Sequence, residues 1–346
     1  MTATKDAKPM HEAKLKIDGR SIGPGHAPYL IAEIGINHDG DPAKAKALLA
    51  AAAEAGAHAA KFQAYGTAAL LTRHSAYYDI IDKCQLSAET FRSLMQEAKS
   101  LGLTVFASVF DEDSASMMEA LDAPAYKIAS GDLTHHPLLR HVAAFGKPMI
   151  VSTGGAAIGE VDAALAAIRE AGPSTPVGLM HCVSNYPTEA GDTNLACLET
   201  MARQFGLPVG FSDHTIGSTA AIASVALGAT MVEKHFTLDS NADGPDHKLS
   251  AEPDDLRTLA AAIETTWRHI GTGSKRPVES PELITQIRRG VTANRSIAKG
   301  ERIVRDMLGV KRPATGIAPE HLSDLIGQTA NRQIEADSPI TWEMLG

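Results

Sequence analysis

The stretch YLIAEIGINHDGDPAKAKALLAAAAEAGAHAAKFQ, residues 29–63, sets a pattern that the rest of the chain repeats. It opens with a short apolar run at 29–34 and closes with a second run at 58–63, and both are typical of buried β-strands. Between them, residues 42–56 have the pattern of an α-helix that ends at Gly56, a residue that commonly follows the last helical turn. This segment therefore predicts a strand, a helix and a second strand.

Apolar runs of the same kind recur along the chain and alternate with helical patterns. Eight strands are expected, at residues 29–34, 58–63, 103–108, 125–129, 148–152, 177–182, 208–212 and 230–236. A last helix is predicted at 253–270. Eight strand-and-helix units over roughly 240 residues match the size of a (β/α)₈ TIM barrel, which makes α/β the predicted fold class. A doubly wound open sheet is the alternative, but no GxGxxG turn follows the first strand.

The segments outside this alternation predict the domain organisation. Residues 1–28 are expected to form an N-terminal tail and a segment that caps the barrel, and residues 29–271 the TIM-barrel catalytic domain. Residues 272–284 contain two prolines and no strong periodicity, so they are predicted to be a linker. Residues 285–346 combine short strand-like pieces with glycine and proline turns, which indicates a small, mostly β domain.

The composition limits the partners and the compartment. The chain has 32 Lys and Arg against 41 Asp and Glu, and the resulting net charge of −9 argues against nucleic acid as the main partner. It contains no run of eighteen apolar residues, so no membrane span is expected. Cys84, Cys182 and Cys197 form no CxxC pair, which favours a reducing, cytoplasmic setting over a disulfide framework.

Polar residues accumulate at the C-terminal ends of the predicted strands, where a TIM barrel carries its active site. Lys61 and Lys127 lie in otherwise apolar strands, and a buried lysine needs an anionic partner. With several serine hydroxyls nearby, the two lysines predict a cradle for a phosphate and a carboxylate. The alternative is a structural ion pair of these lysines with Glu33 or Asp132. Side chains two positions apart share a face of a strand, so Gln63 is expected to point with Lys61.

Two histidines end consecutive predicted strands. His214 and His235 should therefore lie on neighbouring parallel strands, about 4.8 Å apart. Two imidazoles in this arrangement can bind one divalent ion and leave further positions for substrate and water. Imidazole with oxygen ligands suits Mn²⁺, Co²⁺ and Zn²⁺ alike, so these residues alone do not select the metal.

Eight ordered blocks of sequence resemble one enzyme family. They read IAEIGINHDGD, AAKFQ, AYKIASGD, IVSTG, HCVSNYPT, GFSDHTIG, VEKHFTLD and GPDHKLSAEP. Together they resemble the bacterial sialic acid (N-acetylneuraminate) synthases and their relatives that make legionaminic and pseudaminic acids, and the match covers the chain from about residue 15 onward. Residues 291–346, with VKRPATGI and IGQTANRQIEADSPI, are similar to the antifreeze-like (SAF) domain of that family, a β-clip fold.

The resemblance implies a metal-dependent transferase. Such an enzyme condenses phosphoenolpyruvate with N-acetylmannosamine or a related 2-acetamido sugar and releases phosphate. His214 and His235 match the metal ligands, with Mn²⁺ or Mg²⁺ as the usual activator and Co²⁺ as a further candidate. The resemblance also implies a domain-swapped homodimer, in which Arg312 reaches the barrel of the neighbouring subunit and holds the N-acetyl group.

The same resemblance implies roles for further residues. By position, the phosphoenolpyruvate contacts are Lys61, Lys127, Ser108, Ser130, Ser152 and Ser212. The contacts to the sugar are Gln63, Asp132, Ser184, Tyr186, Asp246 and Arg312. Glu33 is expected to transfer the proton of an attacking water, with Asp246 or a metal-bound water as the alternative, and Lys127 is assigned with these two carboxylates to catalysis.

The chain also departs from the family pattern. The third strand reads ASVFD where relatives usually have STPFD, and Ser184 stands where some members carry Asn. Asp132 replaces a glutamate that is common among the neuraminate-making members. Because its carboxylate is one methylene shorter, we expect it to favour a bulkier 2,4-diacetamido-6-deoxy sugar, as in legionaminate synthesis.

Other functions remain open. A pseudaminic acid synthase would use the same reaction on another acceptor, and a class I aldolase would form a Schiff base on Lys61 or Lys127. A non-catalytic carbohydrate- or ice-binding protein would fit the antifreeze-like end of the chain. That last hypothesis does not explain the two lysines, the paired histidines or Glu33.

Overall fold

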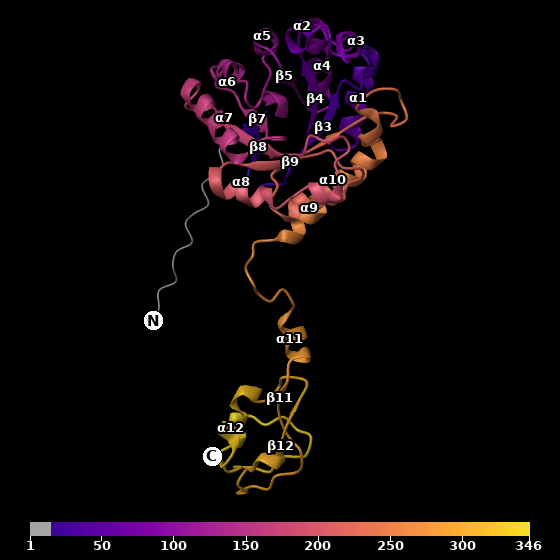
Figure 1. Cartoon of the computed structure of the whole chain (residues 1–346). Helices are drawn as coiled ribbons and strands as arrows, with labels where there is room; N and C mark the ends of the chain where they lie inside the picture. Colours follow the sequence, from indigo (N-terminus) through magenta and orange to yellow (C-terminus); the bar gives the residue numbers. More distant parts are fainter. Residues whose placement is uncertain (1–14) are drawn as a thin grey trace. The chain divides into compact units, whose positions relative to one another are not determined.

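The computed structural model describes residues 15–346, which divide into two compact units between Thr272 and Gly273. The first unit contains a closed barrel of eight parallel strands in the order β10-β3-β4-β5-β6-β7-β8-β9 (Figure 1). The predicted TIM barrel is thus confirmed. No helix within the described residues is long and apolar enough to cross a membrane.

The barrel strands lie where the apolar runs predicted them. Their bounds are β3 Tyr29–Gly35, β4 Ala59–Ala64, β5 Thr104–Val109, β6 Tyr126–Ile128, β7 Met149–Ser152, β8 Val177–His181, β9 Val209–Asp213 and β10 Met231–His235. The helices that follow them are α1 Pro42–Glu54, α4 Ala88–Ser100, α5 Glu112–Ala120, α6 His136–Ala143, α7 Ile158–Ala171, α8 Cys197–Phe205, α9 Thr219–Ala226 and α10 Pro253–Ile270. The loop between β4 and α4 adds two short helices that the sequence pattern did not predict, α2 Thr67–Leu70 and α3 Tyr78–Lys83.

Asp, Ser and Gly residues set the ends of several of these helices. The side chain of Asp41 accepts a hydrogen bond from the N–H of Ala43 at the start of α1, and Ser87 does the same for Thr90 in α4. Such caps satisfy backbone donors that have no partner inside the helix. Gly56 then adopts a positive φ of 88° after α1, a conformation that glycine reaches without strain.

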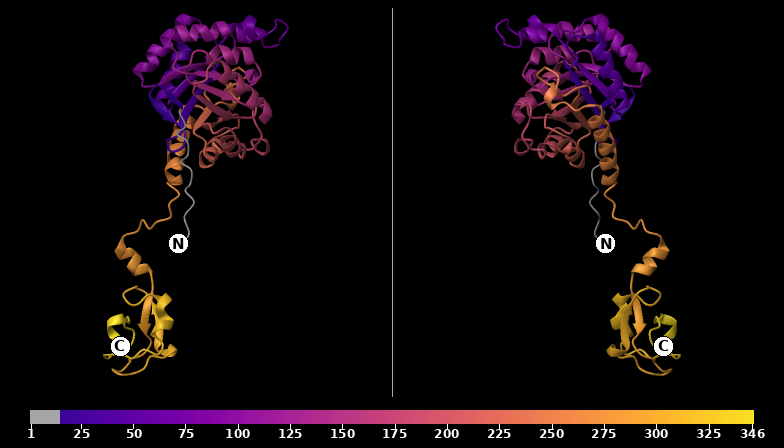
Figure 2. Two further views of the ribbon diagram at one scale, coloured as in Figure 1. Left: turned by 90° about the vertical axis from the view of Figure 1, so that its left-hand side faces the viewer. Right: turned by 90° about the vertical axis from the view of Figure 1, so that its right-hand side faces the viewer.

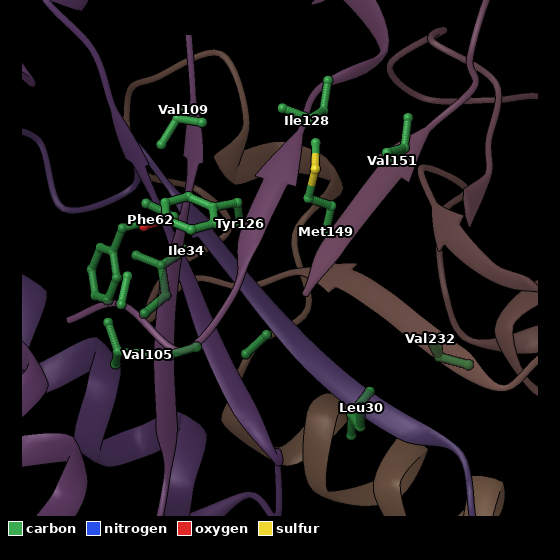
Figure 3. Close-up of a cluster of buried hydrophobic side chains, with 14 of the residues drawn as sticks. Leu30, Ile34, Phe62, Val105, Val109, Tyr126, Ile128, Met149, Val151 and Val232 are labelled. Carbon is green, nitrogen blue, oxygen red and sulfur yellow. The ribbon is translucent and has the colours of Figure 1, made fainter. Parts of the chain in front are cut away.

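Alternate side chains of the strands face two different layers. Those facing outward, such as Ile34 of β3 and Phe62 of β4, belong to the buried cluster drawn in Figure 3. Phe62 packs there against Phe91 of α4, with ring centroids 6.4 Å apart. Those facing inward are apolar at the N-terminal end of the barrel and polar at its C-terminal end. On β10, Met231 lies in an apolar cluster at the N-terminal end of the barrel, whereas Glu233 and His235 line a cavity at the other end. This polarity places the functional groups at the C-terminal ends of the strands.

A short hairpin packs into the apolar end of the barrel. Its strands, β1 Leu15–Ile17 and β2 Arg20–Ile22, pair antiparallel, and Leu15, Ile17 and Ile22 are buried in the cluster that contains Met231. A β-carbon on the glycine at position 178 would come within 2.8 Å of both Leu15 and Met231, so the barrel interior is tightly filled here. The hairpin lies within residues 1–28, where a tail and a capping segment were expected, and residues 1–14 of that range lie outside the described residues.

The second unit contains a helix that overlaps the end of the range 272–284, which was predicted to be a linker. Helix α11 spans Pro281–Ile287, because Ser280 caps it by accepting a hydrogen bond from the N–H of Leu283 at 3.2 Å. The antiparallel strands β11 Gly290–Ala293 and β12 Leu308–Lys311 follow, drawn in orange to yellow in Figure 2. With the short helix α12 Leu322–Leu325, they enclose a separate core of small and medium apolar side chains.

Candidate active site

A cavity of about 420 Å³ opens at the C-terminal ends of the barrel strands. Most of the site residues predicted from the sequence line it: Glu33, Lys61, Gln63, Ser108, Lys127, Ser130, Ser152, Ser184, Tyr186, Ser212, His214, His235 and Asp246. Two do not. Asp132 lies at the end of a 3₁₀ turn beside the cavity, and Arg312 is an exposed residue of the second unit.

Two buried lysines form the floor of this cavity. The ammonium group of Lys61 contacts the carboxylate of Glu33 and donates a hydrogen bond to Ser108 Oγ at 2.8 Å. Lys127 Nζ lies 3.5 Å from Glu233 Oε1, and Lys61 Nζ lies 3.6 Å from Glu233 Oε2. The ion pair of Lys61 with Glu33 is therefore present, and it belongs to the same group of side chains as the expected anion cradle.

The sequence reasoning gave Glu233 no role, although it lies at the centre of this group. It contacts both lysines and accepts a hydrogen bond from Ser212 Oγ at 2.8 Å. The missed signal was parity: Glu233 is two residues before His235, so the two side chains share the inward face of β10. Lys234 points to the other face, where its ammonium group lies 3.0 Å from Asp213 Oδ2.

Burial and the neighbouring lysines together give the two glutamates different pKa values. It raises the pKa of Glu33 to about 7, against the opposing influence of Lys61. Burial also opposes the ionisation of Glu233, but Lys127 and Lys61 outweigh it and hold the pKa of Glu233 at about 2. Near neutral pH, Glu233 is thus the permanent counter-charge, while Glu33 can both accept and release a proton.

The two histidines lie next to each other, with ring centroids 5.4 Å apart. Burial lowers the pKa of His214 to about 4 and that of His235 to about 3, so both rings are neutral at pH 7. His214 Nδ1 is 2.6 Å from the carbonyl oxygen of Val183, which places its proton on Nδ1. Its Nε2 lies 3.3 Å from Ser212 Oγ, but that hydroxyl donates its proton to Glu233, so the Nε2 lone pair is available to a ligand. His235 Nδ1 is buried, has no hydrogen-bond partner among the described residues, and lies 3.8 Å from Asp246 Oδ2.

These neutral nitrogens fit a divalent metal ion. Imidazole binds metals in its neutral form, and an unpaired buried nitrogen is unfavourable unless a ligand satisfies it. No group of three His, Cys, Asp or Glu side chains within residues 15–346 is arranged to hold a metal by itself. A metal at this position would accordingly be held by His214 and His235 together with oxygen atoms of substrate or water.

The loop that carries Asp246 is tied to the end of the first barrel strand. Asn37 Nδ2 donates to Phe236 O and to Ser250 Oγ, both at 3.0 Å. Ser250 Oγ in turn donates to the carbonyl oxygen of Asp246 at 2.6 Å. Asn37 therefore fixes where Asp246 stands relative to His235.

Two further features shape the mouth of the cavity. The ring of Tyr186 stacks on His214, with centroids 4.2 Å apart and planes at 30°. Gly35 has a φ of +54°, and a β-carbon there would lie 3.1 Å from Glu33 Oε1 and 3.5 Å from Asp246 Oδ2. A side chain at position 35 would thus crowd the two carboxylates.

A TIM barrel with two buried lysines and two neutral histidines at its C-terminal face has the architecture of a barrel enzyme. The NeuB family model matches residues 48–275, and the SAF domain model matches residues 288–346. The chain belongs to the NeuB family, as the sequence blocks indicated.

Known relatives cover most of the chain. An uncharacterized protein of Methanocaldococcus jannaschii is 40% identical over 96% of this chain and 98% of its own length. The N,N'-diacetyllegionaminic acid synthase of Legionella pneumophila is 35% identical, covering 95% of this chain and 98% of that enzyme. The crystal structure of N-acetylneuraminic acid synthetase from Leptospira borgpetersenii, 31% identical, superposes with a TM-score of 0.75 over 78% of this chain and 94% of that one.

Proposed function

We propose that this chain condenses phosphoenolpyruvate with the aldehyde of an N-acyl amino sugar and releases phosphate, giving a nonulosonic acid. The observation that carries the proposal is the pair of buried lysines, Lys61 and Lys127, beside two neutral histidines in one cavity. Relatives named as synthases of legionaminic and neuraminic acids support the same class of reaction.

The lysines and serines bind the anionic substrate. Lys61 and Lys127 stabilise its phosphate and carboxylate, and the hydroxyls of Ser108, Ser130 and Ser152 orient it by hydrogen bonds. Ser152 Oγ is buried and has no hydrogen-bond partner among the described residues, as expected for a hydroxyl that hydrogen-bonds to a bound substrate. The same lysines stabilise the negative charge that accumulates on phosphate as it leaves.

The reaction then needs one bond to form between carbons and one water to add. C3 of phosphoenolpyruvate attacks the aldehyde carbon, and C2 becomes electron-poor. Water adds to C2 and gives one of its protons to Glu33. Glu33 passes this proton to the alkoxide formed from the aldehyde oxygen, which becomes a hydroxyl group. The tetrahedral C2 then expels phosphate, the second proton of the water leaves with it, and C2 becomes a ketone. Glu33 suits this transfer because its pKa lies near neutrality.

His214 and His235 would hold Mn²⁺ or Mg²⁺ at the aldehyde side of the cavity, with Co²⁺ as a further candidate. A divalent metal bound there supplies Lewis acidity toward the carbonyl oxygen. Asp246 lies beside His235 and is the second carboxylate available for proton transfer on this side.

Asp132, beside the cavity, bears on the choice of the acceptor sugar. Burial raises the pKa of Asp132 to about 6, and its short side chain leaves room near the distal part of the sugar. The shorter side chain favours a bulkier 2,4-diacetamido-6-deoxy sugar over N-acetylmannosamine. Faster turnover of N-acetylmannosamine than of the diacetamido sugar by the purified enzyme would contradict this assignment, and a pseudaminic-type acceptor belongs in the same panel.

Arg312 would complete the sugar site from a second subunit, in a domain-swapped homodimer. Its exposed guanidinium group, in the second unit, is free for such a contact. Light scattering should give the mass of a dimer. Arg312→Ala should raise the KM for the sugar and leave that for phosphoenolpyruvate unchanged.

A Schiff-base aldolase is the second candidate, because burial lowers the pKa of Lys127 and so raises the fraction of its amine that is neutral and nucleophilic. Borohydride treatment with pyruvate would trap a covalent adduct in that enzyme, and EDTA would leave it active. The proposed synthase should give no adduct and should lose activity with EDTA. A phosphate-release assay with phosphoenolpyruvate, several 2-acetamido sugars and several divalent metals tests the proposal.

A further inference from the structure

One side of the cavity is lined by carbon rather than by polar atoms. Three half-buried side chains, Leu70 of α2, Ile81 of α3 and Phe110 after β5, line the cavity there. We call them the apolar wall. They pack on a small cluster of buried side chains, Ile36, Tyr65 and Cys84, which is separate from the main core of the barrel.

The apolar wall is held in place by hydrogen bonds behind it. Tyr65 OH donates to the carbonyl oxygen of Ile81 at 2.9 Å. The N–H of Gly66, just before α2, donates to Asp111 Oδ2 at 2.8 Å. Gln85, just after α3, accepts from both the N–H and the hydroxyl of Thr67 at 3.1 Å. Both short helices are therefore anchored at their ends, and the wall is a preformed part of the site.

The order of the strands places Phe110 of the wall across the barrel from His214. In the closed order, β5 and β9 are separated by four steps in either direction. Phe110 directly follows β5, and His214 directly follows β9, so the two lie at opposite sides of the opening. An acceptor whose aldehyde carbon lies at the histidines extends its chain across the opening. The atoms that reach the wall are those farthest from the aldehyde, at C6, while the N-acyl group on C2 stays near the reacting end.

We propose that the apolar wall receives the C6 methyl group of a 6-deoxy amino sugar. This inference rests on the proposed function and names the class of its acceptor. A hydroxymethyl group placed against Leu70, Ile81 and Phe110 loses its hydrogen bonds to water and finds no polar partner in the wall, whereas a methyl group fills the same space with favourable contacts. A wall of this kind discriminates against one added hydroxyl by about 10- to 100-fold.

Two acceptors that differ by a single oxygen atom test the proposal. N-acetylmannosamine and its 6-deoxy analogue carry the same aldehyde and the same acyl group, so the ratio of their kcat/KM values isolates the contribution of C6. The wild-type chain should prefer the 6-deoxy sugar at least 10-fold. Ile81→Asn and Leu70→Asn should each lower that ratio toward one, because each introduces a hydrogen-bonding group where the hydroxyl would lie.

The chain offers a matched control on the same helix. Ile80 is 46% exposed and does not line the cavity, so Ile80→Asn should fold and keep the wild-type ratio. Ile81→Ala serves if Ile81→Asn does not fold, because it removes the methyl contacts without adding a polar group and should also lower the ratio.

The outcomes separate this inference from the proposed function. Turnover of both sugars with no preference at C6, or a preference that the folded Ile81 and Leu70 variants leave unchanged, would overturn the inference alone. A change in preference for N-propanoyl over N-acetyl sugars, with the C6 ratio constant, would show that the wall receives the acyl group instead and would also overturn it. Absence of phosphate release with every amino sugar would remove the proposed function, and this inference with it.

Discussion

Replacement of Glu233 by glutamine tests how the two buried lysines are held before any substrate binds. Glu233 Oε1 lies 3.5 Å from Lys127 Nζ, and Glu233 Oε2 lies 3.6 Å from Lys61 Nζ. Lys61 keeps Glu33 in the variant, whereas Lys127 loses its ion pair. Removing one partner of a buried ion pair costs about 3–5 kcal/mol, because a buried charge is left without compensation. For a domain of this size, each kcal/mol corresponds to about 2–4 °C, so the barrel should melt on the order of 10 °C lower.

Calorimetry with a matched control variant measures this effect. Glu170→Gln breaks an exposed ion pair, in which the side chain of Glu170 is 68% exposed and that of Arg140 is 44% exposed. This substitution should lower the free energy of unfolding by less than about 1 kcal/mol. Phosphoenolpyruvate should raise the melting temperature of Glu233→Gln more than that of the wild type, because its negative charges replace the missing carboxylate. A Glu233→Gln variant that melts like the Glu170→Gln control, or that phosphoenolpyruvate stabilises less than the wild type, would refute the reasoning.

Four further changes have defined outcomes. Burial lowers the pKa of His58 to about 4, so the contribution of its neutral ring to stability is present above pH 6.5 and is lost as the pH falls from 6.5 toward 4. His58→Gln should remove this pH dependence of the free energy of unfolding, at most about 3 kcal/mol, in urea titrations. His235→Ala should abolish both activity and Mn²⁺ binding measured by calorimetric titration, while Mn²⁺ binding at wild-type strength would argue against this metal ligand. Asn37→Ala should lower kcat roughly 10- to 100-fold through misplacement of Asp246, without changing stabilisation by phosphoenolpyruvate, and an unaltered kcat would contradict the positioning role. Arg312→Ala should leave the free energy of unfolding within about 0.5 kcal/mol of the wild type, because the side chain is exposed, and a larger loss in urea titrations would indicate a structural role.

The barrel could be predicted from the sequence because the apolar strand runs and the helix-capping residues indicate the same elements. Each strand is buried on both faces and therefore appears as a continuous apolar run, and Asp, Ser or Gly residues mark the ends of several helices. The helices α2 and α3 were missed because four- and six-residue helices are too short to show a helical period. Helix α11 was missed for a related reason: its single capping serine lies among prolines that are typical of a linker.

The site was predictable where strand parity decides which way a side chain points. Parity brought Lys61 and Gln63, and likewise Ser212 and His214, to one cavity. The same rule places Glu233, two residues before His235, on the inward face of β10, but the charged neighbour Lys234 on the outward face hides this in the sequence pattern.

The apolar wall could not be found in this way, because Leu70 and Ile81 reach the cavity from a loop to which no strand rule applies. Their position depends on tertiary hydrogen bonds, such as that from Tyr65 OH to Ile81 O, that the local sequence pattern does not reveal.

The central claim, that the chain joins phosphoenolpyruvate to an amino-sugar aldehyde with cleavage between C2 and oxygen, has a direct test. Phosphoenolpyruvate labelled with ¹⁸O at the bridging position is incubated with the enzyme, a divalent metal and a 2-acetamido-6-deoxy sugar. The account predicts one ¹⁸O-labelled phosphate for each nine-carbon acid formed, and no phosphate release when the sugar is omitted. Unlabelled phosphate, or phosphate release at the same rate without the sugar, would contradict it.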